Sequence, residues 1–203
     1  MIASSTNKSK QKTIKNEINF TGIGLHSGTH ANVKITSDYP NSGITFIRTD
    51  LKENNTIKAL WPNVSATNLS TTISNGKEAS VSTIEHLMSA LSGMHIDNAK
   101  VYIDGPEVPI LDGSSKLFVE FIERAKIQDQ NVPRKIIKVK KEVEVIKGDS
   151  FVRIIPHNQF SIDFEIEFDS HLVNKQACQL QLVNGNYKKD ISAAGCTQWC
   201  AGS

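Results

Sequence analysis

The sequence predicts an α+β protein, in which short strands and two helices follow one another without the regular spacing of βαβ units. Short segments rich in β-branched and alternating apolar residues lie between turn clusters such as residues 39–43. Two other segments carry apolar residues at helical spacing instead. Hydrophobic residues make up 38% of the 203 residues and charged residues 22%, which is typical of a globular chain that can form a core.

Four strands are expected in the first half of the chain, because β-branched and aromatic residues are frequent there between turn residues. They cover Ile14–Phe20, Ala31–Ile35, Ile44–Arg48 and Lys100–Ile103. Each of these segments is short, so none is long enough to be mistaken for a helix.

Two helices are expected in the same part of the chain. The first should extend from about Thr83 to Ser92, with Gly93 as its C-cap, and the second from about Ser115 to Ile127, with Ser114 as its N-cap. Apolar residues recur at i, i+3, i+4 and i+7 in the first and line one face of the second. These residues are Ile84, Leu87, Met88, Leu91, Leu117, Phe118, Phe121 and Ile122.

A domain boundary is expected near Asn131, because the polar run Gln128–Asn131 is followed by Pro133. The predicted first domain covers residues 1–131 and the second covers residues 132–203. In the second domain, apolar residues at 160, 162, 164, 166 and 168 alternate with polar or acidic ones, the pattern of a strand with one buried face. A helix-like segment begins at Tyr187.

Charge and cysteine content limit the classes of partner and compartment. The 23 Lys and Arg against 21 Asp and Glu leave a net charge of +2, which does not favour a nucleic acid or an anionic membrane as partner. Three cysteines are an odd number and do not form a disulfide framework, so a reducing compartment, the cytoplasm, is expected. No stretch reaches the roughly 20 apolar residues that span a membrane.

The clearest candidate for chemistry is the pair Glu85-His86. Ser82 followed three residues later by Glu85 is typical of a capping box, which would make Glu85 a purely structural residue. The residue expected to pack on Val81 in such a box is His86, where an apolar side chain would serve better. The positive end of the helix dipole favours a neutral imidazole that can bind a metal, and it stabilises a neighbouring carboxylate. Spacing alone leaves both interpretations open.

Two loops rich in glycine or proline are further candidates. Residues 22–28 (GIGLHSG) place His26 between glycines, which fits either a tight turn or backbone that approaches a ligand closely. Ser27 stands where a dinucleotide-binding motif needs its third glycine, so that fold is not favoured. Residues 104–115 (DGPEVPILDGSS) predict a rigid loop, in which Asp112 either orients a catalytic histidine or closes a turn.

Taken in order, three segments resemble one enzyme family: residues 22–28, residues 81–98 (VSTIEHLMSALSGMHIDN) and residues 104–115. From about Ile14 to Ala194 the chain is similar to UDP-3-O-acyl-N-acetylglucosamine deacetylases, zinc amidohydrolases of lipid A (lipopolysaccharide) synthesis in Gram-negative bacteria. The resemblance implies two domains of similar build, each packing two helices against small sheets. It also implies a monomer that binds a small-molecule substrate, the acylated UDP-sugar, and no nucleic acid.

By the same resemblance, His86 matches the first zinc ligand and Glu85 matches the general base. Leu69 falls in a small insert that borders the active site, and His26 and Asp112 match positions near it, so all three are expected to contact substrate. The implied reaction is zinc-assisted hydrolysis of the acetamide. Zinc lowers the pKa of its bound water toward about 7, Glu85 takes the proton, and acetate leaves.

The end of the chain departs from the family. A catalytic zinc needs about three protein ligands, and the family's further His and Asp ligands and its proton-donating His have no match here. The family continues Ser192–Ala194 with Arg-Thr-Phe-Gly, whereas this chain continues with residues 195–203, which hold two of its three cysteines. An incomplete second domain with an aberrant tail from about residue 195 is therefore expected. His157 or His171 would have to supply a missing ligand.

Two hypotheses about function follow. The chain is either a zinc-dependent deacetylase or a catalytically inactive remnant of one that retains at most weak nucleotide-sugar binding. An incomplete second domain would also leave the apolar face of the strand at residues 160–168 exposed.

Overall fold

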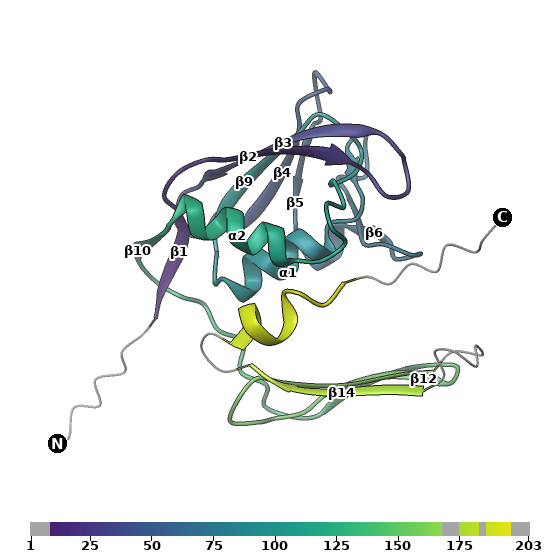
Figure 1. Cartoon of the computed structure of the whole chain (residues 1–203). Helices are drawn as coiled ribbons and strands as arrows, with labels where there is room; N and C mark the ends of the chain where they lie inside the picture. Colours follow the sequence, from purple (N-terminus) through teal and green to yellow (C-terminus); the bar gives the residue numbers. More distant parts are fainter. Residues whose placement is uncertain (1–8, 168–174, 183–185, 196–203) are drawn as a thin grey trace. The chain divides into compact units, whose positions relative to one another are not determined.

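The computed structural model describes residues 9–167, 175–182 and 186–195. Contacts divide the chain into two units: residues up to Arg134 with the segment that begins at Lys188, and Lys135–Tyr187. Several small sheets and few helices make up the chain, which confirms the α+β class (Figure 1). The predicted division into domains at residue 131 stays a prediction.

A five-stranded mixed sheet forms the centre of the first unit. Its order is β2 (Ile18–Ile23), β3 (His30–Ser37), β9 (Ala99–Ile103), β4 (Ile44–Arg48) and β5 (Thr56–Lys58). Only the β4–β9 pair is parallel among these. The strands predicted at residues 31–35, 44–48 and 100–103 lie in β3, β4 and β9. The segment predicted at residues 14–20 instead joins the end of one strand, β1 (Lys10–Ile14), to the start of β2.

Helices α1 (Glu85–Gly93) and α2 (Lys116–Ala125) lie side by side against one face of this sheet (Figure 1). Alternate apolar residues of β3 and β9 are buried because successive side chains of a strand point to opposite faces. Phe20 of β2 packs edge-on against Phe118 of α2, with ring centroids 5.6 Å apart, and stacks on Phe121 at 5.4 Å. Most of the predicted helical face is buried, including Leu87, Leu91, Phe118 and Ile122.

The start of α1 differs from the prediction. The helix begins at Glu85, and Ile84 before it provides no side-chain cap. Thr83 has a φ of 55°, in the left-handed region. The backbone N–H of Ser82 donates to the carbonyl of Pro106 at 2.9 Å, so the predicted capping box between Ser82 and Glu85 is wrong.

The other helix ends lie within two residues of the prediction, but the capping positions are Met94 and Ser115 instead of the predicted Gly93 and Ser114. Gly93 is the last residue of α1, and the left-handed position that ends many helices is taken by His95, with a φ of 61°. At the start of α2, the Ser114 hydroxyl accepts the N–H of Lys116 at 3.1 Å. The helix ends at Ala125 because Ile127 already belongs to the next strand.

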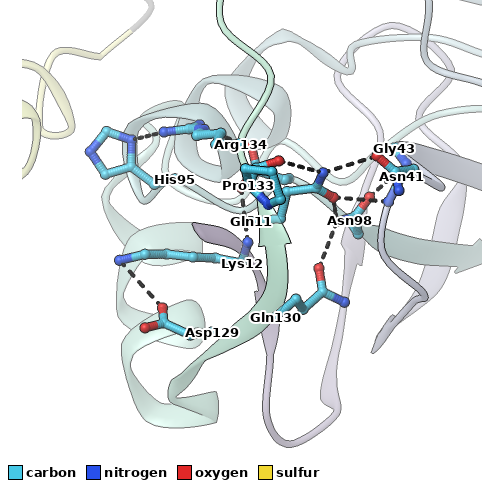
Figure 2. Close-up of polar contacts among 11 residues, drawn as sticks. Gln11, Lys12, Asn41, Gly43, His95, Asn98, Asp129, Gln130, Pro133 and Arg134 are labelled. Atoms are coloured by element: carbon cyan, nitrogen blue, oxygen red, sulfur yellow. Dashed lines mark hydrogen bonds and ion pairs between the residues drawn. The ribbon is translucent and has the colours of Figure 1, made fainter. Parts of the chain in front are cut away.

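A second pair of strands, β1 with β10 (Ile127–Pro133), is fixed to the rest of the unit by buried amides (Figure 2). The Asn98 side chain donates to Gln11 at 2.9 Å and to Gln130 at 2.7 Å, and it accepts the N–H of Gly43 at 2.9 Å. Gln11 in turn bonds both ways with Asn41. Asn98 is 1% exposed, so each of these groups satisfies a polar atom that water cannot reach.

A small antiparallel sheet precedes α1. It consists of β6 (Val64–Ala66), β7 (Thr72–Ser74) and β8 (Ser80–Val81), in that order. Leu69 lies in the connection between β6 and β7.

The second unit contains two antiparallel pairs, β11 (Val143–Lys147) with β12 (Ser150–Ile154), and β13 (Ser161–Glu167) with β14 (Lys175–Gln181). Phe160 is 64% exposed and Phe164 54% exposed. The alternation therefore does not produce a buried face in the described part of this strand, and the exposure expected above is observed instead. The predicted helix-like segment forms one helical turn, η2 (Tyr187–Ile191).

Among the described residues, every helix is too short or too polar to cross a membrane.

The Asn98→Ala variant should be destabilised by about 2–4 kcal/mol, because it leaves several buried donors and acceptors unpaired at once. Urea unfolding followed by circular dichroism measures this loss. The matched control is Asn19→Ala, which removes an exposed side chain that bonds only to Glu17 among the described residues and should cost less than about 0.5 kcal/mol. Equal losses in the two variants would contradict the structural role of Asn98.

Candidate active site

The Glu85 carboxylate is held in place by the backbone of the small sheet. Its Oε2 accepts the N–H of Thr71 at 2.9 Å. The N–H of Ile84, the residue before Glu85, donates to the carbonyl of the same Thr71 at 3.3 Å. Oε1 has no hydrogen bond to the described residues. Glu85 is only half-buried, so solvent reaches it.

His86 is the next residue of the same helical turn and is also half-buried. Its backbone carbonyl accepts the hydroxyl of Ser115 at 3.0 Å, which connects the first turn of α1 to the start of α2. Its imidazole forms no hydrogen bond with the described residues. The first turn of α1 thus carries a carboxylate and an imidazole at successive positions.

The described residues do not by themselves fit a catalytic zinc ion. They contain no group of three or more His, Cys, Asp and Glu side chains that could hold a metal, whereas a catalytic zinc takes about three protein ligands. His157, one of the suggested replacements, forms a local hydrogen bond with Gln159 in the second unit. His171, Cys196, Cys200 and the tail from residue 196 lie outside the described residues.

Leu69 lies two residues before the peptide that holds Glu85. It has a φ of 60° and its side chain is 91% exposed. A left-handed backbone and an exposed apolar side chain are both unfavourable for leucine, and such features gather at binding sites. The position is consistent with the substrate contact predicted for Leu69, which stays a prediction.

Asp112 and His26 are exposed on two loops that contact each other. Asp112 Oδ1 accepts both the N–H and the hydroxyl of Ser114, at 3.0 and 2.9 Å. Of the two roles predicted for Asp112, these bonds correspond to the closing of a turn. No histidine bonds to Asp112 among the described residues. Ile110 of this loop donates to the carbonyl of Ile23 at 3.2 Å, beside the His26 loop.

The residue that joins these loops is Glu107, which the sequence did not single out. Its side chain is 1% exposed. It accepts the N–H of His26 at 3.0 and 3.2 Å, the N–H of Ser27 at 2.7 Å and the hydroxyl of Thr83 at 2.7 Å. One carboxylate therefore connects all three of the segments that carry the family resemblance.

The glycines of residues 22–28 are explained by the same contact. A Cβ at Gly24 would lie 2.5 Å from Glu107 Oε2, and a Cβ at Gly22 would lie 2.9 Å from the Cβ of Pro109. Both distances are too short for a side chain to fit unless its neighbours move. The tight turn predicted for this loop is present, since the N–H of Gly28 donates to the carbonyl of Gly24 at 3.0 Å and Gly28 has a φ of 61°. Gly22 and Gly24 approach the chain's own loop, and close approach to a ligand stays a prediction.

Thr83 is strained at this junction. It is buried and β-branched, yet it has a φ of 55°, a conformation that costs about 1–3 kcal/mol. Its hydroxyl bond to Glu107 offsets part of that cost. Burial alone would raise the pKa of Glu107, but the hydrogen bonds from His26, Ser27 and Thr83 outweigh it and hold this pKa below the ordinary value.

The lowered pKa of Glu107 makes the stability of the first unit sensitive to acid. A carboxyl group whose pKa is lower in the folded than in the unfolded state stabilises the fold above the unfolded value, near 4.5, and this contribution is lost as the pH falls through the folded value. We therefore expect Glu107→Gln to cost about 2–4 kcal/mol at pH 7. This difference from the wild type should shrink below pH 4.5. Urea unfolding between pH 7 and pH 3 measures both.

The control for this titration is Glu17→Gln, the same change at an exposed position. Its difference from the wild type should be small and should not vary with pH. If the difference in unfolding free energy between Glu107→Gln and the wild type stays constant from pH 7 to pH 3, the charge of Glu107 does not contribute to stability.

Comparisons with known proteins show the family of this chain. Residues 11–197 match the family model described as UDP-3-O-acyl N-acetylglycosamine deacetylase. Proteins named UDP-3-O-acyl-N-acetylglucosamine deacetylase from Methylococcus capsulatus and Teredinibacter turnerae are 42% and 43% identical to this chain, over 91% of it and 61% of their own length. The one from Syntrophus aciditrophicus is 39% identical over 91% of this chain and 58% of its own. The chain thus spans about three fifths of these relatives, and it belongs to the UDP-3-O-acyl N-acetylglycosamine deacetylase family.

Proposed function

We propose that this chain takes part in the hydrolysis of the acetamide of UDP-3-O-acyl-N-acetylglucosamine, which releases acetate during lipid A synthesis. The observation that carries the proposal is the Glu85-His86 pair in the first turn of α1, placed in a chain of this family. The names of the relatives support the same substrate. We propose the cytoplasm as the compartment and a monomer as the working form.

Glu85 acts as the general base in this proposal. The N–H of Thr71 fixes one carboxylate oxygen and leaves the other for a water molecule, so the carboxylate keeps one orientation while it accepts a proton. His26, Leu69 and Asp112 contact the substrate. The exposed leucine suits the acyl part of such a substrate, whereas the imidazole and the carboxylate suit its polar part.

Zinc is the metal we propose for the complete site, with His86 as one ligand. A neutral imidazole is a good zinc ligand, and the positive helix end favours the neutral form. The remaining ligands come from outside the described residues, because those residues offer no group of three.

A catalytically inactive remnant of the enzyme is the second candidate. The observation that favours it is that the described residues contain no group of three side chains that could hold a metal ion. Such a chain would keep the loops around Glu107 and could retain weak binding of the nucleotide sugar without hydrolysis.

Zinc content and acetate release together separate the two candidates. If the chain is an enzyme, the purified protein should hold about one zinc ion per chain by atomic spectroscopy and should release acetate from the UDP-sugar. Absence of both supports the remnant. Zinc without acetate release would also contradict the deacetylase proposal, since a loaded site would then lack the reaction.

Within an active chain, Glu85→Gln should lower the rate of acetate release about 10²–10⁴-fold, because the amide cannot accept the proton. The fold should be unaffected, since Gln can still accept the N–H of Thr71. Glu78→Gln makes the same change at an exposed turn and is the control. An unchanged rate in Glu85→Gln would exclude Glu85 as the base.

A further inference from the structure

We propose that Glu107 is a positioning residue of this site, which fixes the first turn of α1 and thereby the Glu85 carboxylate and the His86 imidazole. The inference rests on the proposed function in one respect, that Glu85 and His86 are taken as the reacting pair. Glu107 itself does not touch the substrate in this proposal. It acts through the two segments to which its carboxylate bonds, the His26 loop and the segment before α1.

The first step in the argument is the double contact between the Glu107 peptide and the segment before α1. On one side of Glu107, the carbonyl of Pro106 accepts the N–H of Ser82 at 2.9 Å, and on the other, the N–H of Val108 donates to the carbonyl of Ser82 at 3.1 Å. The Glu107 side chain adds the bond to Thr83. Main chain and side chain together hold two successive residues, Ser82 and Thr83, in one orientation.

The second step is the short path from Thr83 to the reacting groups. Only Ile84 separates Thr83 from Glu85, and the N–H of Ile84 and the carboxylate of Glu85 both bond to the Thr71 peptide. If Thr83 left its left-handed conformation, the chain after it would change direction, and these two bonds could not both remain. The orientation of Glu85 therefore depends on the hydrogen bond that Thr83 donates to Glu107.

The third step is the contact of the same loop with His86. Residues 104–115 end at Ser115, whose hydroxyl donates to the His86 carbonyl. The loop thus meets the first turn of α1 at Thr83 and again at His86. On its other side, Glu107 holds the backbone of His26 and Ser27. The carboxylate sets the distance between the His26 loop and the helix that carries Glu85.

The charge of Glu107 is essential to this arrangement, because every partner of its carboxylate is a donor. The partners include the backbone N–H groups of His26 and Ser27 and the hydroxyl of Thr83. A carboxylate accepts at both oxygens, whereas glutamine would place an NH₂ group against one of these donors. The substitution keeps the size of the side chain and removes only this match.

The test is an NMR comparison of the chemical shifts of the histidine ring signals in the full chain. In Glu107→Gln, the signals of His26 and His86 should move, while that of His95 should not. Asp97→Asn is the matched control. Asp97 also accepts two N–H donors, from Lys12 at 2.9 Å and Arg134 at 2.7 Å.

Asp97→Asn should leave the His86 signal in place and move that of His95, because Arg134 bonds to both Asp97 and His95. If Glu107→Gln destabilises the chain as much as Asp97→Asn but leaves His86 unmoved, Glu107 is merely structural and the proposal is wrong. A movement of all histidine signals in both variants would overturn it as well, since it would indicate general loosening.

A milder variant covers the case in which Glu107→Gln does not fold. Thr83→Val keeps the β-branched shape and removes only the hydroxyl that bonds to Glu107. It should move the His86 signal and leave the His26 signal nearly unchanged, because the backbone bonds from His26 and Ser27 remain. An unmoved His86 signal in this variant would contradict the proposal.

Catalysis provides a separate readout. If the chain releases acetate, Thr83→Val should lower kcat about tenfold or more while KM changes less than about threefold, since binding groups are untouched and the orientation of the base is lost. If the wild-type chain releases no acetate, the proposed function fails, whereas a moved His86 signal still supports the positioning by Glu107.

Discussion

The first unit depends on one buried carboxylate and the donors gathered around it. A charge that is 1% exposed is costly unless it is fully paired. Glu107 meets this requirement only if the His26 loop, the segment before α1 and its own loop are all in place at once. The requirement makes their arrangement cooperative, because losing one segment leaves the others with an unpaired charge. The region that carries the family resemblance is therefore held together from within.

Three of the seven described non-glycine residues with positive φ lie in the same region. Leu69, Thr83 and Leu111 have φ values of 60°, 55° and 54°, which are rare for residues of these types. Each belongs to a segment that contacts either the first turn of α1 or the His26 loop. A strained backbone conformation persists where the surrounding contacts stabilise it by more than the strain costs. Here those contacts are the Glu107 bonds and the Thr71 peptide, so strain and its support lie together around Glu85.

Sequence patterns predicted the elements whose structure depends on neighbouring residues of the chain. The apolar faces of the two helices and three of the strands were foreseen, because periodicity reflects burial on one face. The capping box failed because the N–H of Ser82 found a partner in Pro106, far along the chain. The role of Glu107 could not be predicted either, because the partners of its carboxylate are all distant in sequence. An acidic residue between two prolines suggests an exposed loop instead. Local patterns singled out Glu85, His86, His26 and Asp112 as candidates, whereas Leu69 and the role of each residue came from the family resemblance. The structure brings their segments together without direct contacts among their side chains in the described residues.

The amide side chains around the buried Asn98 have a consequence for how the first unit responds to its surroundings. Asn98, Gln11, Gln130 and Asn41 carry no ionisable group, so neither acid nor salt weakens their hydrogen bonds directly. The same unit is thus secured at one place by neutral amides and at another by a charge. Acid strong enough to protonate Glu107 removes the support around the first turn of α1, whereas the amide hydrogen bonds around Asn98 do not titrate, so these two sets of contacts fail under different conditions.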